Sequence, residues 1–158
     1  MGGPIDLDPA SADEAQATVK AARYHTINDD GLQQPWIANR LWMNPPFGTI
    51  GDARGRQSVW LDKLFAEVGA GRVRQAVVLV RVATESLWFE PLWDYPLCFV
   101  RGRPRFIPGP GAGEGKNKPN LAIAVVGVGV DTDRFARVFH SFGRVVLPTD
   151  DGESRSLP

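Results

Sequence analysis

The chain has 158 residues, which suits one domain with a sizeable core. Its 18 basic side chains balance its 18 acidic ones, so overall charge cannot drive nucleic-acid binding, and any such binding needs a local basic patch. No apolar run is long enough to span a membrane, and the first residues show no signal-peptide pattern.

The first predicted element is a short strand at residues 5–9 that ends in acidic side chains. Carboxylates at the carboxyl end of a strand, here Asp6 and Asp8, can bind the amino or hydroxyl groups of a cofactor. They can equally offset the dipole of the helix that follows, so the turn alone leaves both roles open. A capping-box pattern, Ser11 with Glu14, predicts that this helix begins there and continues to about residue 23.

A brief strand is predicted at residues 24–26, followed by a turn at residues 28–32. Gly31 is expected to hold the position in this turn where φ is positive. Asp29 and Asp30 precede it, and carboxylates in such turns are more often solvated than bound to a ligand. Their place just before the central strand makes them better candidates for ligand binding than an isolated pair would be.

The central stretch is an apolar run at residues 40–43 that reads as a buried strand, followed by Asn44-Pro45-Pro46-Phe47. Two successive prolines fix φ and remove two backbone donors, so the strand must stop there. The Asn44 side-chain oxygen and the Pro45 carbonyl can hold the two hydrogens of an aromatic amine, while Phe47 stacks on its ring. This arrangement suits methyl transfer to an exocyclic amine. The alternative is an ordinary turn with a surface aromatic.

The remaining predicted elements alternate between apolar strands and amphipathic helices, which indicates a three-layer α/β fold. We expect one compact domain at residues 1–148, with a mobile Gly- and Pro-rich loop at 108–119 and a frayed tail at 149–158. The elements are a helix around 60–68 that ends at Gly69, a strand at 75–82, a short helix at 85–93 weakened by Pro91, strands at 97–100 and 121–130, a helix around 135–142 and a strand at 144–147.

Cys98 is the only cysteine and lies in the apolar run 97–100, so it is predicted to be a buried core residue. A lone cysteine cannot form an internal disulfide, and a reducing cytoplasm is the expected compartment. His25 and His140 are the only histidines, which makes a structural zinc site implausible beside one cysteine. We therefore expect no bound metal.

Three arginines, Arg101, Arg103 and Arg105, alternate along the segment that follows this strand, with Phe106 next to them. If the segment is extended, the three side chains lie on one face. They could simply guard a solvated strand edge. They could also contact phosphates, with Phe106 available for stacking.

Taken in order and spacing, four groups of residues make the sequence resemble the phage-type DNA N6-adenine methyltransferases, the Dam-like family of bacteriophages and prophages. The resemblance spans nearly the whole chain. The groups are Asp6-Leu7-Asp8-Pro9-Ala10, then Tyr24-His25-Thr26 with Asp29-Asp30-Gly31-Leu32, then Trp42-Met43-Asn44-Pro45-Pro46-Phe47-Gly48, and last Arg101-Gly102-Arg103 with Phe106.

The resemblance implies a Rossmann-like, S-adenosylmethionine-dependent methyltransferase that acts on double-stranded DNA in the cytoplasm of a bacterial host, without a metal. Asp8, Pro9 and Ala10, with Asp6 on the same strand, would form the first cofactor-binding motif, near the methionine end. Asp29 and Asp30 would face the adenosine. Residues 44–47 would be the catalytic motif, and the segment 103–106 would flank the target base.

Three features depart from the family pattern. Such proteins usually have a Thr-Pro-containing segment upstream of the first strand, whereas four residues precede Ile5 here, which implies low cofactor affinity or a minimal form. The glycine-rich loop common to methyltransferases is replaced after Asp8 by Pro9-Ala10-Ser11. Family members often carry Tyr where this chain has Phe47, so stacking survives but a hydroxyl is lost.

The leading hypothesis is therefore transfer of a methyl group to N6 of a flipped-out adenine. One alternative is an amino methyltransferase with another target, such as cytosine N4, an RNA base or a protein amide. Another is a non-catalytic nucleic-acid-binding module with a degenerate cofactor site. A domain this small either reads few bases or forms a homodimer to cover its site.

Overall fold

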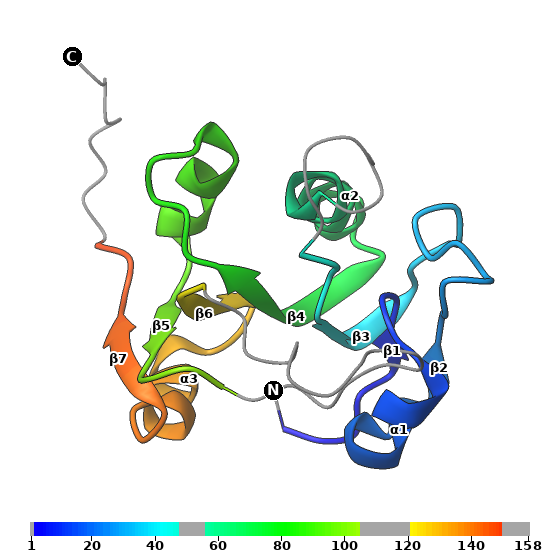
Figure 1. The fold of residues 1–158 in the computed structure, drawn as a ribbon, viewed down its shortest axis with the longest axis horizontal. Helices are drawn as coiled ribbons and strands as arrows, with labels where there is room; N and C mark the ends of the chain where they lie inside the picture. The colour runs from blue at the N-terminus through cyan, green and yellow to red at the C-terminus, as the bar shows by residue number, and fades with distance from the viewer. Residues whose placement is uncertain (1, 48–55, 105–120, 150–158) are drawn as a thin grey trace.

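The computed structural model describes residues 2–47, 56–104 and 121–149. These residues form one seven-stranded sheet in the order β2-β1-β3-β4-β6-β5-β7 (Figure 1). The strands are β1 (Leu7–Asp8), β2 (Arg23–Tyr24), β3 (Ala38–Met43), β4 (Val73–Arg81), β5 (Leu97–Val100), β6 (Ile123–Val128) and β7 (Gly143–Val146). The helices are α1 (Asp13–Val19), α2 (Gln57–Gly69), the 3-10 helix η2 (Leu87–Asp94) and α3 (Thr132–Phe139).

The first four strands pair in parallel, and the direction changes only in the second half of the sheet. β6 lies antiparallel between β4 and β5, and β7 lies antiparallel to β5 at the edge. A mostly parallel sheet of this kind buries both faces under helices, which explains the unbroken apolar run of β4. The predicted three-layer, Rossmann-like α/β sheet is confirmed.

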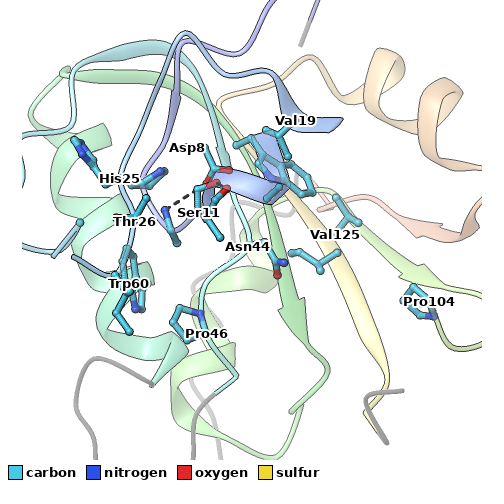
Figure 2. A pocket seen from close by; sticks show the side chains of 18 of the residues that line it. Asp8, Ser11, Val19, His25, Thr26, Asn44, Pro46, Trp60, Pro104 and Val125 are labelled. Carbon is cyan, nitrogen blue, oxygen red and sulfur yellow. Dashed lines mark hydrogen bonds between the residues drawn. The ribbon is translucent and has the colours of Figure 1, made fainter. Parts of the chain in front are cut away.

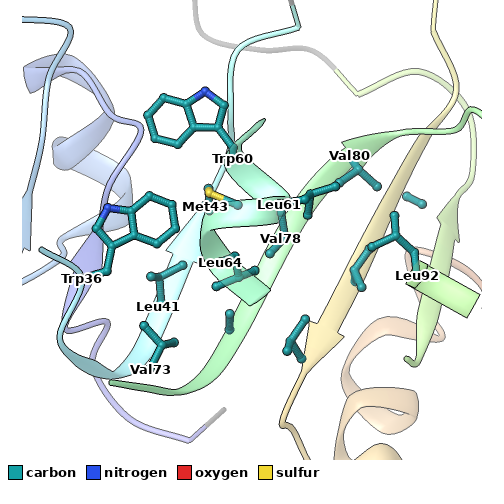
Figure 3. Close-up of a cluster of buried hydrophobic side chains, with 14 of the residues drawn as sticks. Trp36, Leu41, Met43, Trp60, Leu61, Leu64, Val73, Val78, Val80 and Leu92 are labelled. Atoms are coloured by element: carbon teal, nitrogen blue, oxygen red, sulfur yellow. The ribbon is translucent and has the colours of Figure 1, made fainter. Parts of the chain in front are cut away.

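The two faces of the sheet carry separate apolar clusters. On one face, α2 and η2 pack on the sheet (Figure 1), and the fully buried Leu41, Met43 and Val78 meet Leu61 and Leu64 of α2 (Figure 3). On the other face, α3 brings Phe135 against alternate residues of β4 and β6. Because side chains alternate along a strand, β4 supplies both clusters.

The face beneath α3 also contains Cys98, which is fully buried, as predicted. Its thiol lies 3.4 Å from the carbonyl oxygen of Phe139. Burial raises the pKa of the Cys98 thiol. This cysteine is therefore an apolar packing residue.

Among the described residues, no helix is long and apolar enough to cross a membrane.

The predictions for the first helix and for residues 85–93 need correction, and one helix cap was not predicted. The first helix covers only Asp13–Val19, because Lys20 adopts a left-handed conformation with φ of 52° and the chain turns into β2. The segment predicted as a short helix at 85–93 is the 3-10 helix η2, and Pro91 inside it cannot donate an α-helical hydrogen bond. Asp131 caps α3 by accepting a hydrogen bond from the Arg134 amide at 2.7 Å, a signal that the sequence reading missed. The loop predicted at 108–119 lies outside the described residues.

Candidate active site

A cavity of about 1110 Å³ lies where the carboxyl ends of β1 and β3 meet, on the face of the sheet that carries α1 and α3. Open α/β sheets bind ligands at this edge. Asp8, Asn44 and Trp60 line it from three separate elements, as Figure 2 shows. Its volume exceeds the usual range for one small ligand, about 300–1,000 Å³. The cavity is therefore large enough for a ligand of cofactor size.

Asp8 places a carboxylate in the wall of this cavity. The residue is 2% exposed. Its side chain accepts hydrogen bonds from the Ala10 amide at 3.3 Å and the Gln16 amide group at 3.1 Å. Burial raises the pKa of the Asp8 carboxyl, although hydrogen bonds from Ser11, Ala10 and Gln16 oppose the shift. A buried carboxylate without a cationic partner among the described residues suits a cationic or hydrogen-bond-donating ligand.

Ser11 and Gln16 hold the Asp8 turn, and this role replaces the predicted capping box. The Gln16 amide group donates to the Ser11 hydroxyl at 2.7 Å as well as to Asp8. The structure places the N-cap at Ala12, and no side chain caps α1. The capping-box prediction is wrong because the Ser11 side chain lies in the cavity network instead of over the first helical turn. Sequence reasoning gave Gln16 no role.

Asp6 and Asp8 lie on the same strand but have different surroundings. The Asp6 carboxylate accepts hydrogen bonds from the backbone amides of Asn39 and Arg40, each at 2.9 Å. It also lies 3.7 Å from the Arg40 guanidinium. Asp6 does not line the cavity. Its contacts fix β3 beside β1 and thereby place the end of β3 next to Asp8.

In the acidic turn, residues 28–32, Asp29 and Asp30 also have different roles. Asp29 accepts hydrogen bonds from the amide and hydroxyl of Thr26, at 2.7 and 2.8 Å, and these bonds lower the pKa of its carboxyl. Asp29 does not line the cavity, whereas Asp30 does. The residue with positive φ is Asp30, at 49°, and not Gly31 as predicted from the sequence.

Gly31 is required for a different reason, close approach. A Cβ atom built on it would lie 2.0 Å from the Pro9 carbonyl oxygen and 3.3 Å from the Trp60 ring. The absence of a side chain therefore lets the acidic turn press against the end of β1. The indole nitrogen of Trp36 donates to the Gly31 carbonyl at 2.8 Å, and Trp36 stacks on Trp60 with ring centroids 6.0 Å apart.

The Asn-Pro-Pro-Phe segment follows β3 and brings Asn44 and Pro46 to the wall of the cavity (Figure 2). The side-chain oxygen of Asn44 is buried and has no hydrogen-bond partner within the described chain. Pro46 lines the cavity, and Pro45 beneath it is buried. Phe47 is partly buried and packs against the apolar cluster under α3. An unpaired buried acceptor is costly, so its presence in a cavity indicates a ligand that donates to it.

His25 is a site residue to which sequence reasoning assigned no contact. Its backbone amide donates to the Asp8 carbonyl at 3.0 Å, and its carbonyl accepts from the Ser11 amide at 2.9 Å. Its ring lines the cavity, and the Nε2 atom is buried without a partner among the described residues. Burial lowers the pKa of His25, and nearby Asp29 only partly opposes this shift. The ring is thus favoured in its neutral form, with a nitrogen available to a ligand.

The predicted basic segment begins at the rim of the cavity. Val100 and Pro104 line the cavity, and both Arg101 and Arg103 between them are exposed. Arg105 and Phe106 lie outside the described residues. Within the described ranges, no three His, Cys, Asp or Glu side chains are grouped closely enough to hold a metal ion.

Comparison with known proteins gives one family match. No curated protein matches the chain. A crystal structure of Thermoplasma acidophilum 1320 shares 14% sequence identity at a TM-score of 0.36, over 74% of this chain and 61% of that one, so this chain spans about three-fifths of its length. A likeness at this level says nothing about the reaction. The family model for "DNA N-6-adenine-methyltransferase (Dam)" matches residues 2–135, a range that contains Asp8, Asp30 and Asn44. With most of its length matched, the chain belongs to the Dam family of DNA N6-adenine methyltransferases.

Proposed function

We propose that this protein transfers a methyl group from S-adenosylmethionine to the exocyclic N6 of an adenine flipped out of double-stranded DNA. The observation that carries the proposal is one cavity joining the buried Asp8 carboxylate to the unpartnered Asn44 oxygen. Family membership supports the reaction class. The flipped base is required because N6 of a stacked adenine cannot reach a buried side chain.

The charge and the lining of the cavity support binding of this cofactor. Asp8 offers a carboxylate to the cationic methionine end, and the Pro9–Ala10 backbone lies beside it at the end of β1. Asp30 and the neutral ring of His25 line the part where the adenosine would bind. Asp6 and Asp29 are positioning residues, because the carboxylate of each accepts hydrogen bonds from nearby backbone amides. When bound, the cofactor supplies an electrophilic methyl group on a sulfonium.

The chain's own contribution to the chemistry is to hold the amine in line. The Asn44 side-chain oxygen accepts one N6 hydrogen, and the Pro45 carbonyl accepts the other. These bonds favour the tetrahedral nitrogen that develops as the N–C bond forms and the S–C bond breaks. The proton lost from N6 then leaves to solvent. Pro46 lines the cavity and limits rotation of the base, while Phe47 anchors this segment to the apolar cluster under α3.

The test is methyl transfer from labelled S-adenosylmethionine to unmethylated DNA, RNA and protein, followed by nucleoside analysis. N6-methyladenine in DNA supports the proposal. Label in cytosine N4, RNA or protein would replace adenine N6 as the target of the reaction. If calorimetry detects no binding of the cofactor at millimolar concentration, a non-catalytic nucleic-acid-binding module is favoured instead.

The Asn44→Ala variant probes the mechanism. Losing a transition-state acceptor should lower kcat by about 10²–10³ while the cofactor Kd stays near that of the wild type. Circular dichroism and a denaturation curve check that the variant folds. Unchanged turnover in folded Asn44→Ala protein would rule out this role.

A further inference from the structure

A second hollow, of about 410 Å³, lies on the same face of the sheet but at the amino ends of β3 and β4. Its lining is rich in arginine: Arg40 comes from β3, Arg74 from β4 and Arg134 from α3. Asn39 and Gln75 add polar groups, and Asp131 is the one acidic lining residue. Three guanidinium groups therefore face one carboxylate, in a protein with no net charge. We call this the arginine hollow.

Part of this positive charge has no neighbouring carboxylate among the described residues. Asp6 lies 3.7 Å from the Arg40 guanidinium, yet the Nε atom of Arg40 is buried without a partner in the described chain. The side chains of Arg74 and Arg134 form no ion pair with any residue in the described ranges. The Asp131 carboxylate already accepts the Arg134 backbone amide. Among the described residues, three guanidinium groups beside the two carboxylates of Asp6 and Asp131 leave one net positive charge, which an anion would offset.

The hollow lies in line with the active-site cavity. Asn44 directly follows β3, four residues after Arg40, and the two residues line the cavity and the hollow respectively. At about 3.3 Å per residue, their Cα atoms are roughly 13 Å apart. Arg40 lies opposite Gln75 of β4, and Trp42 between the two sites lines the cavity. One strand thus carries the amine acceptor at one end and an arginine at the other.

We infer that the arginine hollow binds a phosphate group, and that this phosphate belongs to the DNA strand whose base enters the cavity. The planar fork of arginine matches phosphate oxygens in a bidentate way. Because a DNA strand carries one phosphate per 3.4 Å of helix axis, a phosphate within a few nucleotides of the flipped adenine falls in this span. This inference rests on the proposed function for the source of the phosphate. A free phosphate is the other source of the same chemistry.

The test compares DNA binding by wild type and the double variant Arg74→Ala/Arg134→Ala, using fluorescence anisotropy at several salt concentrations. If the arginines of the hollow together neutralise that one phosphate, the double variant loses roughly one unit from the slope of log K against log salt. Its Kd should rise about tenfold or more near physiological salt. Arg137→Ala is the matched control, because Arg137 is exposed on α3 outside the hollow. It should leave both the slope and the Kd at their wild-type values.

A second arm separates the two sources and the two proposals. Inorganic phosphate is titrated while the arginine Nε–Hε resonances are followed by NMR. If phosphate shifts the Arg74 and Arg134 resonances but the double variant binds DNA normally, the site takes free phosphate and the DNA assignment is overturned. If neither DNA binding nor the resonances respond, the whole inference is overturned. Neither arm requires methyl transfer, so failed catalysis with an intact slope change would refute only the proposed function.

Discussion

Gly31 offers the sharpest test of how the cofactor side of the cavity is built. In the variant Gly31→Ala, the added Cβ would lie 2.0 Å from the Pro9 carbonyl oxygen, whereas real Cβ contacts are almost never shorter than 3.0 Å. The two backbones must therefore separate by at least 1.0 Å, which is the difference between these distances. Both atoms belong to the main chain, so no flexible side chain can absorb the shift. We expect a loss of roughly 3 kcal/mol in the free energy of unfolding, near the upper end for overpacking.

The displacement should also damage function, because the turn that moves carries Asp30 and the chain that it pushes carries Asp8. A misplacement of about 1 Å in a positioned site can cost roughly a hundredfold in rate. Urea denaturation measures the stability, calorimetry with S-adenosylmethionine measures the cofactor affinity, and labelled methyl transfer measures the rate. We expect all three to fall together.

Gly69→Ala is the matched control, because a Cβ at Gly69 would meet nothing within 4 Å. Gly69 ends α2, where alanine should be neutral or stabilise by up to about 1 kcal/mol. If Gly31→Ala lost less than about 1 kcal/mol and bound the cofactor as the wild type does, the close approach of the two segments would not be what shapes this site.

Three further outcomes are expected. Burial raises the pKa of the Asp8 carboxyl above the ordinary 3.8, so this group stabilises the fold below pH 3.8 and loses that contribution as the pH rises through the raised pKa of the folded protein. Its ¹³Cγ titration should show a midpoint above 3.8 that falls when the cationic cofactor binds. A midpoint at the ordinary value would contradict this. Trp36→Phe removes the indole donor to the buried Gly31 carbonyl, which keeps only the Gln34 amide at 3.3 Å, and should cost about 0.5–1.5 kcal/mol in urea denaturation. An unchanged denaturation midpoint would contradict the importance of that bond. The buried Cys98 thiol should resist a thiol reagent in native protein and react in denaturant, and fast native reaction would contradict its burial.

Much of the architecture could be predicted because hydrophobic patterning is local and strong. The unbroken apolar run of β4 predicted an interior strand, and the proline pair predicted where β3 must stop. The end of the first helix was missed because residues 20–23 have no strong breaker, and the left-handed Lys20 that ends α1 is set by packing of β2 on β1. Tertiary context overrides weak propensity in such places.

The candidate site shows the same limit at the level of single side chains. Sequence order predicted that Asp8 and Asn44 would share one sheet edge, and the cavity joins them. It could not separate Asp30, which lines the cavity, from Asp29, which bonds to Thr26, because adjacent carboxylates look alike in a sequence. It also missed the unpartnered His25 nitrogen, since burial of one atom depends on neighbours that are distant along the chain.

The alternation of side chains along β3 has a consequence for how this protein can change over time. Leu41 and Met43 point into the cluster under α2, while Trp42 and Asn44 line the cavity on the reverse side. Substitutions two positions apart should thus share a phenotype, and immediate neighbours should differ: one set lowers the amount of folded protein, and the other lowers only turnover. A saturation mutagenesis screen that scores protein abundance and DNA methylation separately would show the two effects alternating from one residue of β3 to the next. It would also identify positions where substitutions change thermal stability without changing which DNA is methylated.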